Sequence, residues 1–258
     1  MISEPSGGHP AVQVTLDGHG PYTFLVETGA AFVGVSKAIA QSLKLKRVGG
    51  PDEHPGDWLD ELAVGGAVFR QLPVNELELG MPGIDGILGL ALYRDVLLTL
   101  DYPHGKVRLE RGALPEPDGR EILALSRVKE FWGIPIAVGN RQLAVVLDTQ
   151  ADGGLGLPPP VAAQLPFVSD AVVIGKARGA FGETEVKGGE LAAPLRVGRY
   201  EFPHPWITVR ALPPEWPNLG TMGGRVLKNF TVTLDQRNGR VALRHEGSAP
   251  LELARPKS

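Results

Sequence analysis

A stretch in the middle of the chain returns, without a gap, near its C-terminal end. Residues 85–109 and 219–243 are identical at eight of 25 aligned positions. The identical pairs are Gly86/Gly220, Gly89/Gly223, Thr99/Thr233, Leu100/Leu234, Asp101/Asp235, Gly105/Gly239, Val107/Val241 and Leu109/Leu243. Self-similarity of this kind is the mark of a duplicated structural unit. The chain is therefore predicted to hold two copies of one fold.

The similarity extends upstream of these segments in the same order. The string "LRVGRYEFPHPWITV" mirrors "LAVGGAVFRQLPV", and "LAVVLDTQADGGLGLPPPVAAQL" mirrors "YTFLVETGAAFVGVSKAIAQSL". Glu27 and Asp148 occupy the same point of the two copies, where an apolar strand ends and a threonine follows. The segment "ALPEPDGRE" is rich in proline and charge, as a joint between units would be. We expect one unit over residues 1–117 and a second over 118–258.

Local patterns predict short strands joined by turns. Apolar residues alternate over residues 12–16, Asp17-Gly18 suits a turn, and a second strand follows over residues 22–26, which together indicate a β-hairpin. "SKAIAQSL" is typical of a short helix capped by Ser36. The 34 glycines and 23 prolines are spread along the whole length. This distribution favours a mainly β protein with short helices.

The second copy carries an insertion. Glu27 precedes the glycine loop at residue 85 by 58 positions, whereas Asp148 precedes the loop at residue 219 by 71. The 13 extra residues fall around "GKARGAFGETEVKGG", which is punctuated by glycine. We expect a projecting hairpin there.

Composition removes several classes of function. With 26 basic and 29 acidic side chains the net charge is −3, and no basic run suits a phosphate backbone, so nucleic acid is not an expected partner. The chain has no cysteine and no HExxH or other close pairing among its six histidines, so neither a metal site nor a cofactor is expected. No serine lies in a G-x-S-x-G elbow, and the glycine-rich stretches fit neither the dinucleotide fingerprint nor the phosphate loop.

The duplication predicts that Glu27 and Asp148 lie next to each other. Two copies packed about a pseudo-two-fold axis place equivalent residues face to face, as an isologous interface does. Glu27 and Asp148 are then neighbours, and two carboxyl groups a few Å apart share one proton and titrate as a coupled pair. The ionised member can take a proton from water while the protonated member donates one to a carbonyl oxygen. This chemistry hydrolyses amides without a covalent intermediate.

The motifs resemble a known family. The pattern of two apolar residues, an acid, Thr, Gly and Ala, the later "GILG" and the closing "TLDYPHGKVRL" look like the retropepsin-type unit of bacterial aspartyl proteases. Two such units in one chain resemble the two-lobed, pepsin-like arrangement. The resemblance implies an all-β, two-lobed acid protease fold and an aspartic-type endopeptidase that acts on peptides or proteins.

Carried over by position, the resemblance assigns the site residues. The catalytic acids are Glu27 and Asp148, and the supporting residues next to them are Thr28, Gly29, Thr149 and Gln150. Substrate contacts are expected from Ala30, Ala151, Gly86 and Gly220. Asp101 and Asp235 precede turns and are expected to be structural.

This sequence departs from the family pattern in both copies. The first motif reads "ETG" where the family has an aspartate, and the second reads "DTQ" where it has a glycine. An extra methylene moves a carboxyl group by about 1 Å, a shift that can cost about a hundredfold in rate. Two hypotheses follow: an active endopeptidase, or a catalytically impaired pseudo-protease that binds peptides in the same cleft.

The remaining expectations concern the setting of the protein. No apolar run reaches the roughly 18 residues of a membrane span, and a monomer is expected. The N-terminus "MISEPSGGHP" lacks the features of a secretory signal. We expect a soluble protein and leave its compartment undecided: periplasmic or secreted if a leader has been removed, and otherwise cytoplasmic.

Overall fold

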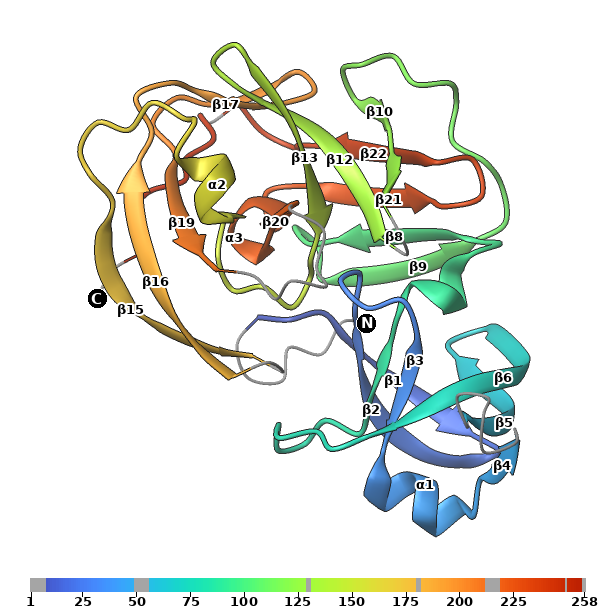
Figure 1. Cartoon of the computed structure of the whole chain (residues 1–258). Coiled ribbons are helices and arrows are strands. Elements are labelled where there is room, and N and C mark those ends of the chain that lie inside the picture. The colour runs from blue at the N-terminus through green and yellow to red at the C-terminus, as the bar shows by residue number, and fades with distance from the viewer. Residues whose placement is uncertain are drawn as a thin grey trace.

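The computed structural model describes residues 8–48, 56–128, 131–179, 182–211, 219–248 and 250–256, which form three β-sheets and a few short helices (Figure 1). The fold is all-β, as the sequence predicts, and the "ETG" and "DTQ" segments lie within it. None of the helices in these ranges is long and apolar enough to cross a membrane.

The first sheet is a closed barrel. Its order is β1-β2-β7-β3-β6-β5-β4, and an additional pairing of β1 with β5 closes six of the described strands into a ring. The strands are β1 (Ala11–Leu16), β2 (His19–Val26), β3 (Val33–Ser36), β4 (Lys46–Val48), β5 (Gly56–Val64), β6 (Ala67–Leu77) and β7 (Gly86–Leu88). Apolar side chains such as Leu16, Phe24 and Leu59 are fully buried inside it.

The local predictions for this unit are confirmed. β1 and β2 form the hairpin, with Asp17 and Gly18 at positive φ in its turn. Helix α1 (Lys37–Leu43) begins at Ser36, whose hydroxyl accepts a hydrogen bond from the Ile39 N–H at 3.4 Å. Such a cap satisfies one of the backbone donors that the first helical turn leaves unpaired.

The second sheet repeats the central pairings of the first. Its path is β15-β16-β19-β14-β20-β13-β12-β17-β18, with β11 joined to β12. The pairs β12–β13, β13–β20, β14–β19, β14–β20 and β12–β17 have the same directions as β1–β2, β2–β7, β3–β6, β3–β7 and β1–β5. The strands are β11 (Ser126–Val128), β12 (Phe131–Val138), β13 (Arg141–Leu147), β14 (Leu155–Leu157), β15 (Val172–Gly179), β16 (Gly182–Glu190), β17 (Leu195–Val197), β18 (Tyr200–Phe202), β19 (Trp206–Arg210) and β20 (Gly220–Met222).

The stretch around "GKARGAFGETEVKGG" forms the predicted hairpin. β15 and β16 pair antiparallel, and β16 pairs with β19, so β15 lies at the edge of the sheet. In Figure 1 the two strands run from the far side of the second sheet toward the side on which the barrel lies. Two short helices, α2 (Pro159–Ala162) and α3 (Gly224–Leu227), flank this sheet.

The third sheet combines strands from both halves of the chain. Its order is β10 (Ile122–Ala124), β22 (Arg240–Arg244), β21 (Thr231–Asp235), β8 (Leu97–Asp101) and β9 (Lys106–Glu110), and the 3₁₀ helix η1 (Leu90–Tyr93) precedes β8. β8 and β21 pair antiparallel with Thr99 opposite Thr233, and the two hydroxyl oxygens are 2.9 Å apart. Equivalent residues of the repeat therefore meet at the centre of this sheet.

Asp101 and Asp235 close turns, as expected. The Asp101 carboxylate lies 2.8 Å from the His104 ring and accepts a hydrogen bond from the Thr231 hydroxyl. Asp235 accepts hydrogen bonds from the backbone N–H groups of Leu114 and Asn238. Both carboxylates hold the third sheet together and do not contact Glu27 or Asp148.

Candidate active site

The two acids of the repeat end equivalent strands. Glu27 follows β2, and its N–H donates to the carbonyl of Leu88 at 3.0 Å, at the end of β7. Asp148 follows β13, and its N–H donates to Met222 at the end of β20, also at 3.0 Å. Each strand is buried up to the acid, and the chain turns there, so the carboxyl group emerges where the strand stops.

The threonines after the acids lock the two loops together. The Thr28 hydroxyl donates to the Leu147 carbonyl at 2.6 Å and accepts from the Thr149 N–H at 3.2 Å. In return the Thr149 hydroxyl donates to the Val26 carbonyl at 2.6 Å and accepts from the Thr28 N–H at 3.1 Å. Both threonines are buried, so each of these four bonds is made away from water. The lock fixes the position of one acid relative to the other.

Removing one hydroxyl should loosen this lock. Thr149→Val keeps the side-chain shape but leaves the Val26 carbonyl and the Thr28 N–H without their partners. An unpaired buried group costs about 1–3 kcal/mol, so we expect the free energy of unfolding to fall by roughly 2–4 kcal/mol. Urea unfolding measures it, with Thr15→Val on β1 as the control. Equal stability of the two variants would show that the lock contributes nothing.

Gly29 lets the two carboxyl groups approach. A Cβ atom placed on Gly29 would lie 3.0 Å from the Oδ1 of Asp148 and 3.0 Å from the Oε1 of Glu27. The two oxygens can therefore be no further apart than twice that distance, which is within the range of a coupled pair. Glycine is needed here because a side chain would fill the space between the acids.

Other glycines let the chain segments behind the acids pack closely. A Cβ on Gly89 would overlap the carbonyl of Phe32, and one on Gly223 would overlap the carbonyl of Ala151. The carbonyls of Ala30 and Ala151 accept hydrogen bonds from Leu90 and Gly224. The loops after the acids thus rest on the segments that follow β7 and β20.

The four residues expected to contact substrate fall into two groups. Ala30 and Ala151 are half-buried next to the acids, where a substrate could reach them. Gly86 and Gly220 are buried within β7 and β20, and side chains there would collide with Phe24 and Leu157. The structure gives Gly86 and Gly220 a packing role, which corrects their assignment to substrate binding.

The hydrogen bonds to the two acids are unequal. Oδ1 of Asp148 accepts from the N–H groups of Gln150 at 3.0 Å and Ala151 at 3.1 Å. Oε1 of Glu27 accepts only the Gly29 N–H, at 2.9 Å, among the described residues. Donors that point at a carboxylate stabilise its charged form. Asp148 is therefore the better place for the negative charge.

The titration of the pair follows this asymmetry. The pKa of Glu27 is raised to about 8: burial raises it most, the charge of Asp148 raises it too, and the Gly29 N–H offsets part of the rise. Burial also raises the pKa of Asp148, but the N–H groups of Gln150 and Ala151 and the charges of Arg210 and His9 oppose that rise. These hydrogen bonds and charges favour the proton on Glu27 and the negative charge on Asp148.

His9 is a member of the site that sequence reasoning did not identify. Its Nδ1 lies 3.1 Å from the Thr149 carbonyl and its Nε2 lies 3.1 Å from a carboxylate oxygen of Asp152. Both neighbours are acceptors, so a ring nitrogen that carries hydrogen can donate to either of them. His9 holds the second acid loop, and no motif or spacing marks it in the sequence.

Three buried polar atoms near the acids lack a hydrogen-bond partner among the described residues. They are the hydroxyls of Tyr93 and Tyr102 and the side-chain nitrogen of Gln150. Burial raises the pKa of both tyrosines, and the charges of the acids add to it. Gln150, which replaces the glycine of the family pattern, therefore brings a free donor to the second loop. The described residues contain no cluster of three or more His, Asp or Glu side chains that could hold a metal.

One comparison with known proteins finds a match. Residues 12–92 match the family model described as "Aspartyl protease". The matched segment contains β1 to β7 and η1, and with them Glu27, Thr28 and Gly29. No curated protein matches the chain.

Proposed function

We propose, because residues 12–92 match the aspartyl protease family model, that this chain is an aspartic-type endopeptidase with Glu27 and Asp148 as its two acids. The observation that carries the proposal is the close pair of unequal carboxyl groups, held by the reciprocal threonine bonds. We further propose that residues 1–117 and 118–258 are the two copies of one unit. The matching strand pairings of the first two sheets support this. Because both acids come from one chain, we expect a monomer to be sufficient.

The proposed reaction follows from the titration of the pair. Asp148, ionised, takes a proton from a water molecule as that water attacks the peptide carbonyl. Glu27, protonated, donates its proton to the carbonyl oxygen, so a neutral tetrahedral diol forms. Its collapse breaks the C–N bond: the leaving nitrogen takes up the proton from Asp148 while one hydroxyl of the diol returns a proton to Glu27, so the pair again holds one proton. General acid and base catalysis of this kind contributes about 10²–10⁴ each to the rate.

A second function remains open because of the substituted motifs. Glu27 reaches the pair with one methylene more than the family's aspartate, and Gln150 places a side chain where the family has none. A pseudo-protease would keep the cleft and bind peptides without hydrolysing them. The donor and acceptor geometry at Asp148 favours the enzyme, because it preserves one ionised and one protonated acid.

Cleavage of a denatured protein tests the proposal. We expect fragments, detected by mass spectrometry, between pH 5 and 8, with the rate falling as pH rises through about 8 because Glu27 then loses its proton. A statine-type inhibitor, whose hydroxyl takes the place of the attacking water, should stop the reaction.

The variant Glu27→Asp separates the two functions. It restores the family's side-chain length, so an active enzyme should keep similar or higher activity. A silent wild type with an active Glu27→Asp variant would identify the pseudo-protease. Silence of both, and of Glu27→Asp combined with Gln150→Gly in a folded protein, would reject hydrolysis.

A further inference from the structure

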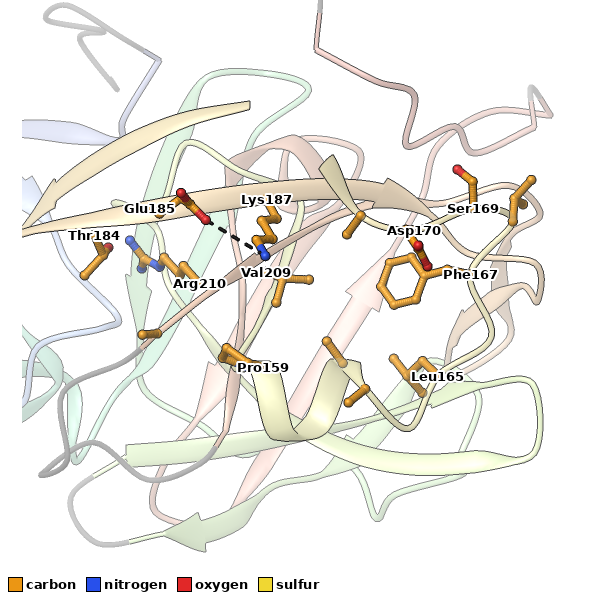
Figure 2. A pocket seen from close by; sticks show the side chains of 15 residues that line it. Pro159, Leu165, Phe167, Ser169, Asp170, Thr184, Glu185, Lys187, Val209 and Arg210 are labelled. Carbon is orange, nitrogen blue, oxygen red and sulfur yellow. Dashed lines mark ion pairs between the residues drawn. The ribbon is translucent and has the colours of Figure 1, made fainter. Parts of the chain in front are cut away.

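A pocket of about 900 Å³ lies in the second unit, under the β15–β16 hairpin (Figure 2). Pro159 of α2 lies on one side of it and Glu185 and Lys187 of β16 on the other. Its apolar lining includes the buried Ala162 and Leu165. Neither Glu27 nor Asp148 lines it, so the pocket does not contain the acid pair. The volume is in the range of sites that take a side chain or small ligand.

Arg210 is the charged group at one end of this pocket. It ends β19, is half-buried, and lies beside Thr184 in Figure 2. No hydrogen bond or ion pair to its guanidinium is found among the described residues. A half-buried cation is stabilised when an anion meets it, and a guanidinium meets a carboxylate with two parallel hydrogen bonds.

The other charges of the pocket are less suited to that role. Lys187 lies 3.9 Å from Glu185, and both side chains are at least half exposed. Asp170 is exposed and lies at the opposite end, next to Phe167. Among the charged residues that line this pocket, Arg210 is the one that is half-buried and whose charge also acts on Asp148. That charge favours the ionised form of Asp148. The positive end of the pocket is therefore the end next to the acids.

We propose that this pocket binds substrate side chains and that Arg210 selects peptides with a carboxylate side chain, Asp or Glu, close to the cleaved bond. The inference rests on the proposed peptidase function and names its substrate class. Alternate side chains of an extended peptide point to the same face about 6–7 Å apart. A substrate with an acid at Arg210 therefore directs its alternate side chains to the face that the pocket lining forms.

Matched inhibitors test this selection separately from catalysis. The probes are two statine-containing peptides that are identical except for Glu or Gln, with the substituted position moved in turn along both sides of the statine. Calorimetry at pH 6, where a peptide Glu is ionised, measures their Kd. At one position we expect the Glu peptide to bind about tenfold more tightly, the effect of one charged hydrogen-bonded contact.

The variant Arg210→Gln should remove the difference by weakening only the Glu peptide. Arg196→Gln, which removes the same charge from an exposed site on β17, should leave it unchanged. Equal binding of both peptides at every position in the wild type would overturn the inference while the proposed function stands. Equal weakening of both by Arg210→Gln would also overturn it, because Arg210 would then act only through Asp148. Binding of neither peptide would overturn the cleft itself and the proposed function with it.

Discussion

Asp148→Asn should lower kcat for peptide hydrolysis by at least about a thousandfold, with the protein still folded. An amide cannot take a proton from water, and it cannot share one with Glu27, so both parts of the proposed reaction are lost. Removal of a general base costs about 10²–10⁴ in rate, and the loss of the shared proton adds to it. Quenched fluorescent peptides read the rate directly.

The backbone donors around Asp148 keep this variant interpretable. Gln150 and Ala151 can donate to the amide oxygen of an asparagine as they do to Oδ1 of the acid, so the loop should keep its shape. Asp60→Asn is the matched control, because Asp60 is exposed and contacts Gln71 alone among the described side chains. Retention of more than a tenth of the wild-type rate by Asp148→Asn would place the chemistry elsewhere.

The sequence could predict the centre of the site because the chain is repetitive. The alignment of the two halves pairs Glu27 with Asp148 and Thr28 with Thr149, and symmetry alone then places each pair face to face. The hydroxyl bonds between Thr28 and Thr149 agree with that inference. The hairpin around residues 172–190 was also predictable, because the glycines that punctuate the insertion suit tight turns between strands.

The roles of other site residues could not be predicted from the sequence, for a physical reason. His9 and Arg210 act on Asp148 or its loop from segments far from it along the chain. Neither residue belongs to a motif or a regular spacing that would mark it in the sequence. The pair Gly86 and Gly220 misled the prediction, because repetition of a glycine can reflect tight packing as readily as substrate contact. The unequal pKa values of the acids also depend on three-dimensional donors that the two nearly identical motifs do not reveal.

Glu27→Gln should change the pH dependence of stability as well as stop hydrolysis. The folded-state pKa of Glu27, about 8, is above its ordinary value of 4.5. The folded protein therefore holds this proton more tightly than the unfolded chain. The stability that this provides is fully present below about pH 4.5 and is lost as pH rises through about 8. The loss amounts to at most about 5 kcal/mol of the free energy of unfolding.

A glutamine is neutral at every pH, so the free energy of unfolding of the variant should not fall through the ionisation of residue 27. Urea unfolding at pH 5 and pH 9 should show a smaller decrease for Glu27→Gln than for the wild type. Glu110→Gln, at an exposed position on β9, should behave as the wild type does. Asp148, whose pKa is also raised, still contributes a decrease of the same sign in all three proteins. An identical decrease in Glu27→Gln and the wild type would mean that Glu27 is ionised in the folded protein at neutral pH, and the proton donor of the proposed reaction would then have to be another group.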